Sequence, residues 1–201
     1  MKITRKLLLG ADVFDAQGSF DPAVRAQYMN GSEAASCIRK QWYTKKSPDA
    51  GDAQDWGYAR RGSHGELYVV SRLRAANVHL AHTGDDQVSV RDDAVRISAT
   101  PDGFVIDDEA SLIYALEIKT IDPRTNRSNL PKPAHILQVQ IAMALADLHR
   151  EQLPELPTHP IASGILVYMD ASNYNDVVEY TVPRNDGVLE EMAQRARRML
   201  N

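Results

Sequence analysis

The chain has 201 residues, of which 43% are hydrophobic and 25% are charged, and its formal net charge is −4. This length suits one well-buried core, and the composition excludes a disordered chain and a membrane-spanning protein. The acidic balance gives no overall attraction to nucleic acid, although basic residues cluster locally, as in Arg39 with Lys40 and Lys45 with Lys46.

The number of cysteines and the N-terminal stretch indicate the cellular compartment of the protein. Cys37 is the only cysteine, which excludes an intramolecular disulfide and a cysteine-bound zinc or iron–sulfur cluster within one chain. We expect Cys37 to be a small buried hydrophobic residue. The start, MKITRKLLLGADVF, lacks a convincing cleavage site, so we expect mature sequence and a cytoplasmic protein.

The predicted elements begin with two helices, over residues 32–46 and 55–76. The first ends before the turn-rich stretch SPDAGD, and the second is indicated by the helical spacing of its apolar residues. Glu66 lies on the same stripe as Val70 and Leu73, so it points inward, where a glutamate is unusual. Gly62, one turn earlier, would let the backbone approach another element closely.

Three strand-like runs follow, near residues 87–90, 95–106 and 112–121, with DDEA as the turn between the last two. After the polar loop PRTNRSNLPKP come a helix (AHILQVQIAMALADLHR), two strands (IASGILVYM and VVEYTV) and a closing amphipathic helix (GVLEEMAQRARRML). This order predicts an α/β (α+β) fold with a central mixed sheet flanked by helices.

We expect a single domain over residues 1–201. Its N-terminal helical part would span about 1–80, its sheet core about 85–170, and its C-terminal strand and helix 176–201.

The hairpin formed by the last two of the three strands brings charges together. If its turn is centred between Glu109 and Ala110, Asp102 lies opposite Glu117, and Lys119 shares their face. Opposed residues have Cβ atoms roughly 5 Å apart, where like charges destabilise the pair. Two such carboxylates need a shared proton or a bound cation, and an all-oxygen site favours Mg²⁺ or Mn²⁺.

Both faces of this hairpin carry apolar residues, so we expect both to be covered. The Asp102 face carries Phe104, Ile106, Ile113 and Ala115, and the other face carries Ile97, Ala99, Val105, Leu112, Tyr114, Leu116 and Ile118.

The later helix adds one inward polar residue. Gln138 shares a face with Ile141 and Leu145, whereas Gln140 falls on the side of Asp147. Taken singly, each inward polar group has the simpler interpretation of a satisfied buried residue, and Pro-Asp-Gly is a common turn sequence. Four inward polar residues and a lysine in one small domain indicate a site.

The ordered set of RRGSHGE, TPDG, LEIKT and QVQ resembles the PD-(D/E)XK nuclease superfamily. Within it, the set is most similar to the YqaJ and lambda-exonuclease-like recombination nucleases and spans about residues 60–145. The matching positions are Gly62, Glu66, Pro101, Asp102, Gly103, Glu117, Lys119, Gln138 and Gln140. The resemblance implies a restriction-endonuclease-like core.

The stretch SEAASCIRKQWYTKK also resembles the N-terminal helix of RecB-type nuclease domains. Those relatives often hold an iron–sulfur cluster through this cysteine and three others near the C-terminus. This chain has none of the three, so we expect no cluster.

The resemblance implies roles for the site residues. Asp102, Glu117 and the main-chain carbonyl of Ile118 would ligate Mg²⁺ or Mn²⁺, and Glu66 would hold a second ion directly or through water. Lys119 would lie beside the attacking water, where its charge or proton acts on the nucleophile or the scissile phosphate.

Three further residues lie around this set. Gln138 would orient Lys119 or the water by hydrogen bonding. Arg60 and Arg61 are candidates for contacts to the DNA backbone. His64 is left unassigned, because an incidental surface histidine is as good an interpretation as a ligand.

The leading hypothesis is therefore a metal-dependent DNA exonuclease that resects duplex ends in phage-type recombination or repair, in a bacterial or phage-infected cell. The first alternative is a RecB-like endonuclease or a single-strand-specific DNA-processing nuclease. The second is a DNA-binding module without turnover, against which the intact set of Asp102, Glu117 and Lys119 argues. A single-strand annealing partner and a homo-oligomer are left open.

Overall fold

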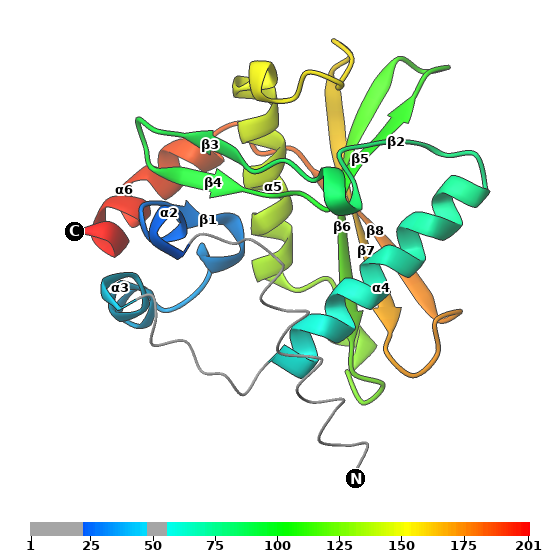
Figure 1. Cartoon of the computed structure of the whole chain (residues 1–201), viewed down its shortest axis with the longest axis horizontal. Coiled ribbons are helices and arrows are strands. Elements are labelled where there is room, and N and C mark those ends of the chain that lie inside the picture. The colour runs from blue at the N-terminus through cyan, green and yellow to red at the C-terminus, as the bar shows by residue number, and fades with distance from the viewer. Residues whose placement is uncertain (1–21, 48–55) are drawn as a thin grey trace, which may run out of the picture.

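A five-stranded mixed sheet forms the centre of the molecule (Figure 1). The computed structural model describes residues 22–47 and 56–201, so the expectation for MKITRKLLLGADVF lies outside the described residues. Strands β6 and β7 are parallel, and the other neighbouring pairs are antiparallel. In their order across the sheet, the strands are β2 (His79–Ala81), β5 (Gly103–Asp107), β6 (Leu112–Ile121), β7 (Ile161–Asp170) and β8 (Val177–Pro183).

A second, three-stranded sheet lies beside the first. Its order is β1 (Met29–Asn30), β4 (Ile97–Ala99) and β3 (Val90–Asp92), with β1 parallel and β3 antiparallel to β4. Short 3₁₀ turns connect several elements: η1 (Gly31–Glu33), η2 (Gly84–Asp86), η3 (Arg127–Asn129) and η4 (Arg150–Gln152).

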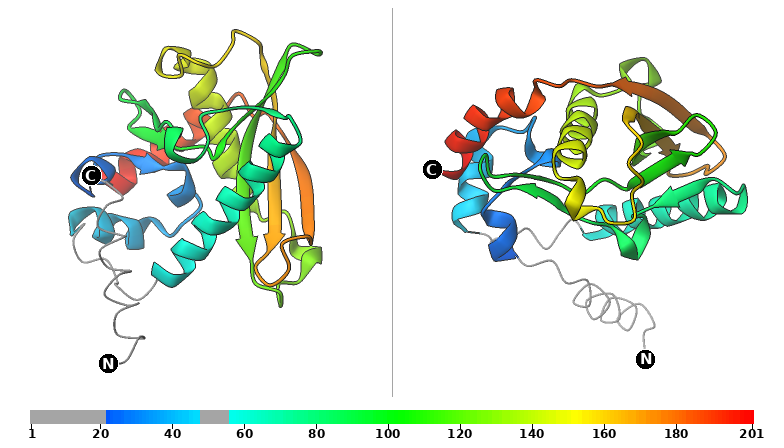
Figure 2. Two further views of the ribbon diagram at one scale, coloured as in Figure 1. Left: turned by 45° about the vertical axis from the view of Figure 1, so that its right-hand side comes forward. Right: turned by 90° about the horizontal axis from the view of Figure 1, so that it is seen from above.

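Helices cover both faces of the central sheet (Figure 2). The helix α5 (Pro133–Leu148) packs on one face and α4 (Trp56–Ala75) on the other. On the α5 side lie α2 (Pro22–Ala26), α3 (Ile38–Lys46) and α6 (Val188–Leu200) (Figure 1). The predicted fold class, a mixed sheet flanked by helices, is confirmed.

The apolar pattern of β6 explains this layering. Ile113 and Ala115 pack in the large core under α5, while Leu116 and Ile118 pack against Val69 of α4 in a second core. A strand buried on both faces reads as a nearly continuous apolar run, which is why residues 112–121 are predicted with the bounds that the structure gives. In the part of the chain that the structure describes, no helix is long and apolar enough to cross a membrane.

Two predicted elements are wrong in their extent. The run 95–106 is two strands in different sheets, because Thr100, Pro101 and Asp102 interrupt it and Pro101 has no N–H to donate to a neighbouring strand. Ile97 and Ala99 consequently belong to the small sheet and not to the hairpin. The strand expected at 87–90 begins only at Val90, and the three-residue β2 is too short to show a period.

The first predicted helix is also shorter than expected. It begins at Ile38 and not near residue 32, because η1 precedes it and Cys37 is extended, with φ −60° and ψ 120°. Cys37 is therefore exposed at the helix start, and the expectation that it is buried is wrong.

Candidate active site

The β5–β6 hairpin has the predicted register. Gly103 pairs with Leu116 and Phe104 with Ala115, the relation that places Asp102 opposite Glu117. Glu117 is 1% exposed and faces α5, on the same side of β6 as Ala115. The sequence therefore directs a carboxylate into the layer between the sheet and α5, at the point where β5 has not yet begun.

Asp102 fills the place that a longer β5 would occupy. Its Oδ2 accepts the main-chain N–H of Ile118 at 2.6 Å. In an antiparallel ladder, the N–H and the C=O of one residue point to the same neighbour, so the carbonyl of Ile118 also lies on the Asp102 side of β6. The missing N–H of Pro101 leaves this edge of β6 open next to two carboxylates.

Lys119 and Gln138 meet at one oxygen of Glu117. The Lys119 ammonium forms an ion pair with Glu117 Oε1, and its side chain keeps 26% of its surface exposed. Gln138 Nε2 donates to the same Oε1 at 2.6 Å from one turn inside α5. The predicted inward orientation of Gln138 is confirmed, but its hydrogen bond goes to Glu117 and not to Lys119. Gln140 turns away and donates to the carbonyl of Pro183.

Glu66 approaches from the opposite face, on α4. Its carboxylate is close enough to feel the charges of Asp102 and Lys119, and its Oε1 accepts the Nε2–H of Gln87 at 2.6 Å. Sequence reasoning missed Gln87, because it lies in the irregular segment after η2, where no periodicity marks its direction. Each of the two glutamates is thus held by the amide of one glutamine.

Gly65 brings α4 close to β6. A Cβ at Gly65 would lie 2.3 Å from Thr120 Oγ1 and 2.8 Å from Met169 Cε, so only glycine fits there without a shift. The expectation that Gly62 makes this approach is wrong, since a Cβ at Gly62 would meet no atom of the described residues within 4 Å. Gly62 lies one turn before Glu66, whereas Gly65, the glycine that makes the close contact, directly precedes Glu66.

The electrostatics of the site show an excess of negative charge. Burial and then repulsion from Asp102 raise the pKa of Glu117 to about 8, and the same two causes raise the pKa of Glu66 to about 7. Burial also raises the pKa of Asp102. Burial opposes the charged form of Lys119, but the attraction of Glu117 and Asp102 outweighs it and raises the lysine pKa. The Lys119 ammonium therefore faces three carboxyl groups, and the simultaneous ionisation of all three is unfavourable in free energy.

The oxygen atoms at this site suit a hard divalent cation that takes only a few ligands from the protein. Within residues 22–47 and 56–201, no three His, Cys, Asp or Glu side chains converge as a ready-made metal cluster. An ion here would be held by Asp102, Glu117 and the Ile118 carbonyl, with water completing the shell, as Mg²⁺ prefers. Such an ion would relieve the repulsion between Asp102 and the buried carboxylate of Glu117.

Gln87 offers a direct check on Glu66. If Glu66 holds a divalent ion, as the sequence predicts, Gln87→Leu should lower Mn²⁺ affinity about 10–100-fold, because groups that orient a ligand matter nearly as much as the ligand. Gln140→Leu is the matched control, since Gln140 bonds to a main-chain carbonyl away from the carboxylates, and it should behave as wild type. Mn²⁺ titration calorimetry measures the affinity. Equal affinities for the two variants would exclude a role of Gln87 at this site.

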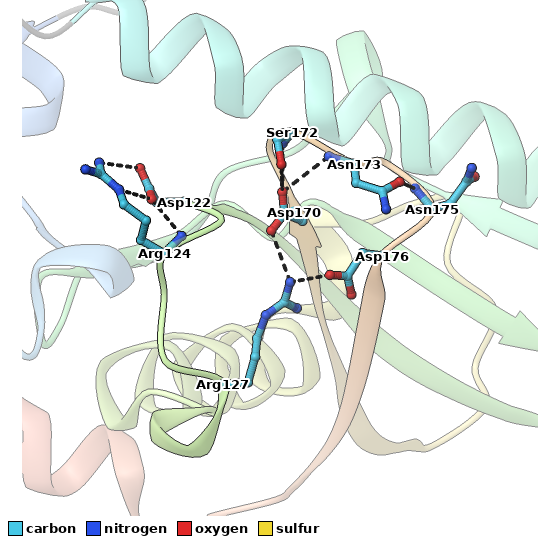
Figure 3. A network of polar contacts seen from close by, with 8 residues as sticks. All are labelled: Asp122, Arg124, Arg127, Asp170, Ser172, Asn173, Asn175 and Asp176. Atoms are coloured by element: carbon cyan, nitrogen blue, oxygen red, sulfur yellow. Dashed lines mark hydrogen bonds and ion pairs between the residues drawn. The ribbon is translucent and has the colours of Figure 1, made fainter.

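The loop between β6 and α5 is fixed by ion pairs (Figure 3). Arg127 joins Asp170 at 3.1 Å and Asp176 at 2.6 Å, and Ser172 donates to Asp170. Arg124 pairs with Asp122 and holds the pKa of that carboxyl at about 2. These bonds tie the loop that follows β6 to the end of β7 and to the turn between β7 and β8.

A second anchor lies at the start of α5. The Tyr168 hydroxyl accepts the N–H of Lys132 at 3.0 Å and bonds to His135 Nδ1 at 2.8 Å. Tyr168 is fully buried and pairs in register with Lys119 across β6 and β7. Burial, Lys119 and Lys132 lower the pKa of His135 to about 4, so the imidazole is neutral at pH 7. Sequence reasoning missed both residues, because nothing in the sequence pairs a β7 tyrosine with an α5 histidine.

The remaining predicted residues lie in the first half of α4. Arg60 and Arg61 are partly exposed and precede Glu66, and the charge of Arg61 reaches Asp122. His64 is exposed.

A cavity of about 170 Å³ lies between Glu117 and the N-terminal elements. Its lining includes Arg25, Asn30, Ser32, Thr100, Glu117 and Gln138.

Comparison with known proteins shows the fold. No protein-family model matches the chain, and no curated protein matches it by sequence. Among solved structures, that of SSO0001 is similar over 100% of this chain and 88% of its own, with a TM-score of 0.65 and 18% identity.

An alkaline exonuclease, LHK-Exo from Laribacter hongkongensis, is similar over 89% of this chain and 88% of its own, with a TM-score of 0.60 and 19% identity. The same enzyme in complex with dAMP has a TM-score of 0.57 and 17% identity, over 89% of this chain and 87% of its own. The chain thus has the fold of these structures.

Proposed function

We propose that this chain is a metal-dependent DNA exonuclease of the PD-(D/E)XK type, which hydrolyses phosphodiester bonds at duplex ends. The observation that carries the proposal is the meeting of Asp102, Glu117 and Lys119 at the open end of the β5–β6 hairpin. The likeness to an alkaline exonuclease supports a nuclease that acts at DNA ends. The motif resemblance supports a role in recombination or repair, in a bacterial or phage-infected cell.

The residues divide the work. Asp102, Glu117 and the Ile118 carbonyl would hold Mg²⁺ or Mn²⁺, with Glu66 as ligand of a second ion. When bound, such an ion would supply positive charge for the phosphate and would lower the pKa of a water molecule. Lys119 extends from the carboxylates toward solvent, so its ammonium can donate hydrogen bonds to a phosphate oxygen or to the attacking water. Gln138 and Gln87 hold Glu117 and Glu66 in place.

Phosphate contacts outside the reacting centre fall to Arg60 and Arg61 in this proposal, because they precede Glu66 on the same helix. DNA is the proposed partner, and the proposal includes no membrane contact. It includes no iron–sulfur cluster, because the chain has one cysteine. A single-strand annealing protein and a homo-oligomer are compatible partners.

The test uses one blunt linear duplex, labelled at the 5′ end or at the 3′ end, and supercoiled circular DNA in a parallel reaction. We expect Mg²⁺-dependent release of nucleotides from one end of each strand of the linear DNA, an intact circle, and no reaction in EDTA. Linearisation of the circle at a comparable rate would replace this proposal with the endonuclease alternative. Full cleavage in EDTA would exclude the metal site.

A further inference from the structure

The helix α3 departs from the acidic character of the chain. Its nine residues, IRKQWYTKK, include four cations and no acid, although the whole chain carries a net charge of −4. Arg39, Lys40 and Lys46 are exposed. A local positive field of this kind attracts a polyanion even when the protein as a whole does not.

Two aromatic rings accompany these cations. Trp42 and Tyr43 meet edge to face with ring centroids 5.0 Å apart, and Tyr43 is 57% exposed. The ammonium of Lys46 lies 5.6 Å from the centroid of the Trp42 ring. An exposed tyrosine braced by a neighbouring ring is a flat, ordered surface for another planar group, and cations beside it suit phosphates.

The helix is anchored to residues beside the cavity that reaches Glu117. Lys45 is turned inward, with Nζ 2.6 Å from Glu33 Oε2 and 3.0 Å from the carbonyl oxygen of Arg25. Glu33 in turn accepts the main-chain and side-chain N–H groups of Asn30. Arg25 and Asn30 line the cavity that reaches Glu117. One cation thus anchors α3, and the other three, Arg39, Lys40 and Lys46, are exposed.

We propose that the exposed face of α3, defined by Arg39, Lys40, Tyr43 and Lys46, binds single-stranded DNA. Unpaired bases expose their flat faces for stacking on Tyr43, whereas the bases of a duplex are already stacked on one another. A duplex offers this surface only its phosphates, so the aromatic ring discriminates in favour of the single strand. The identification of this strand as the one left behind by end resection rests on the proposed function; the binding itself does not.

The test is fluorescence anisotropy with a labelled oligothymidylate and a labelled blunt duplex, in EDTA so that no cleavage occurs. Stacking of one base contributes roughly 1–3 kcal/mol, so Tyr43→Ala should weaken oligothymidylate binding about tenfold and change duplex binding less than twofold. Tyr43→Phe keeps the ring and is the matched control, with affinity close to that of wild type. Tyr43 is exposed, so all three proteins should share one melting temperature.

The cations are tested by salt dependence. The double variant Arg39→Gln/Lys40→Gln should reduce the slope of log affinity against log salt for the single strand by about 1.4, since each phosphate contact contributes about 0.7. Oligothymidylate affinity unchanged within twofold in Tyr43→Ala, or equal losses for single strand and duplex, would overturn the proposal.

These measurements are independent of cleavage. Oligonucleotide binding by a protein that cuts no DNA would refute the proposed function and keep this inference. Metal-dependent cleavage together with unaltered oligothymidylate binding by Tyr43→Ala would support the proposed function and refute this inference.

Discussion

Replacing Glu117 with glutamine should abolish DNA cleavage and, at the same time, leave the metal-free protein at least as stable as wild type. The carboxylate is 1% exposed, and burial and Asp102 hold its pKa near 8, so its ionisation works against folding at neutral pH. Glutamine keeps the shape, and its Oε1 can still accept the Nε2–H of Gln138. Removal of a metal ligand and its charge should lower the cleavage rate by at least about 10³-fold.

Lys119→Met is the companion variant. Methionine retains the length and the apolar stem but removes the ammonium, so we expect a similar loss of cleavage with Mn²⁺ binding retained. Thermal unfolding and single-turnover cleavage of an end-labelled duplex check both variants. Cleavage by Glu117→Gln within tenfold of wild type would remove Glu117 from the active site, and a destabilised Glu117→Gln would show that the carboxylate stabilises the metal-free fold.

Gly65→Ala should destabilise the protein and reduce its activity, whereas Gly62→Ala should do neither. A Cβ at Gly65 collides with Thr120 Oγ1 at 2.3 Å, and Met169, its other close neighbour, is fully buried. Overpacking of this kind costs about 1–3 kcal/mol, and the shift of α4 moves Glu66, the next residue, away from the carboxylates. At Gly62 no described residue comes within 4 Å of a Cβ, so alanine should stabilise the helix by about 0.5–1 kcal/mol.

A compensating change separates this mechanism from a general loss of folding. Thr120 Oγ1 is buried and makes no hydrogen bond to residues 22–47 or 56–201, so Thr120→Ala removes the colliding atom at little cost. The double variant Gly65→Ala/Thr120→Ala should therefore recover part of both the unfolding free energy and the activity. Urea denaturation and cleavage assays measure the two quantities. No recovery in the double variant would show that α4 and β6 do not collide there.

The features that could be predicted from the sequence are those set by the helical period and by the register of the β5–β6 hairpin. Side chains alternate between the two faces of a strand, and this rule with the position of the DDEA turn was enough to place Asp102 opposite Glu117. Helical spacing was enough to predict that Gln138 and Glu66 point inward. These predictions rest on local geometry, in which one residue of slip would reverse a whole face.

The sequence did not predict contacts that long-range packing decides. Gln87 reaches Glu66 from an irregular segment, and Tyr168 reaches His135 from a strand that is 33 residues away. The approach of α4 depends on which glycine faces β6, and the half-buried Gly62 and the buried Gly65 differ only in their tertiary surroundings. Cys37 was expected inside because cysteines usually are, but the late start of α3 leaves it outside.

Titration of the metal-free protein with Mn²⁺, at pH 6, 7 and 8 and in two buffers of different ionisation enthalpy, tests the central claim most directly. The pKa values of Glu66, about 7, and Glu117, about 8, mean that a metal-free site holds protons that an ion must displace. The folded protein binds these protons more tightly than the unfolded chain, so metal-free stability should fall as the pH rises from about 4.5 to about 8. Mn²⁺ affinity should rise over pH 6–8, with proton release, and should be lost in Glu117→Gln. Mn²⁺ binding that is independent of pH and unchanged in Glu117→Gln would contradict a metal site built on these carboxylates.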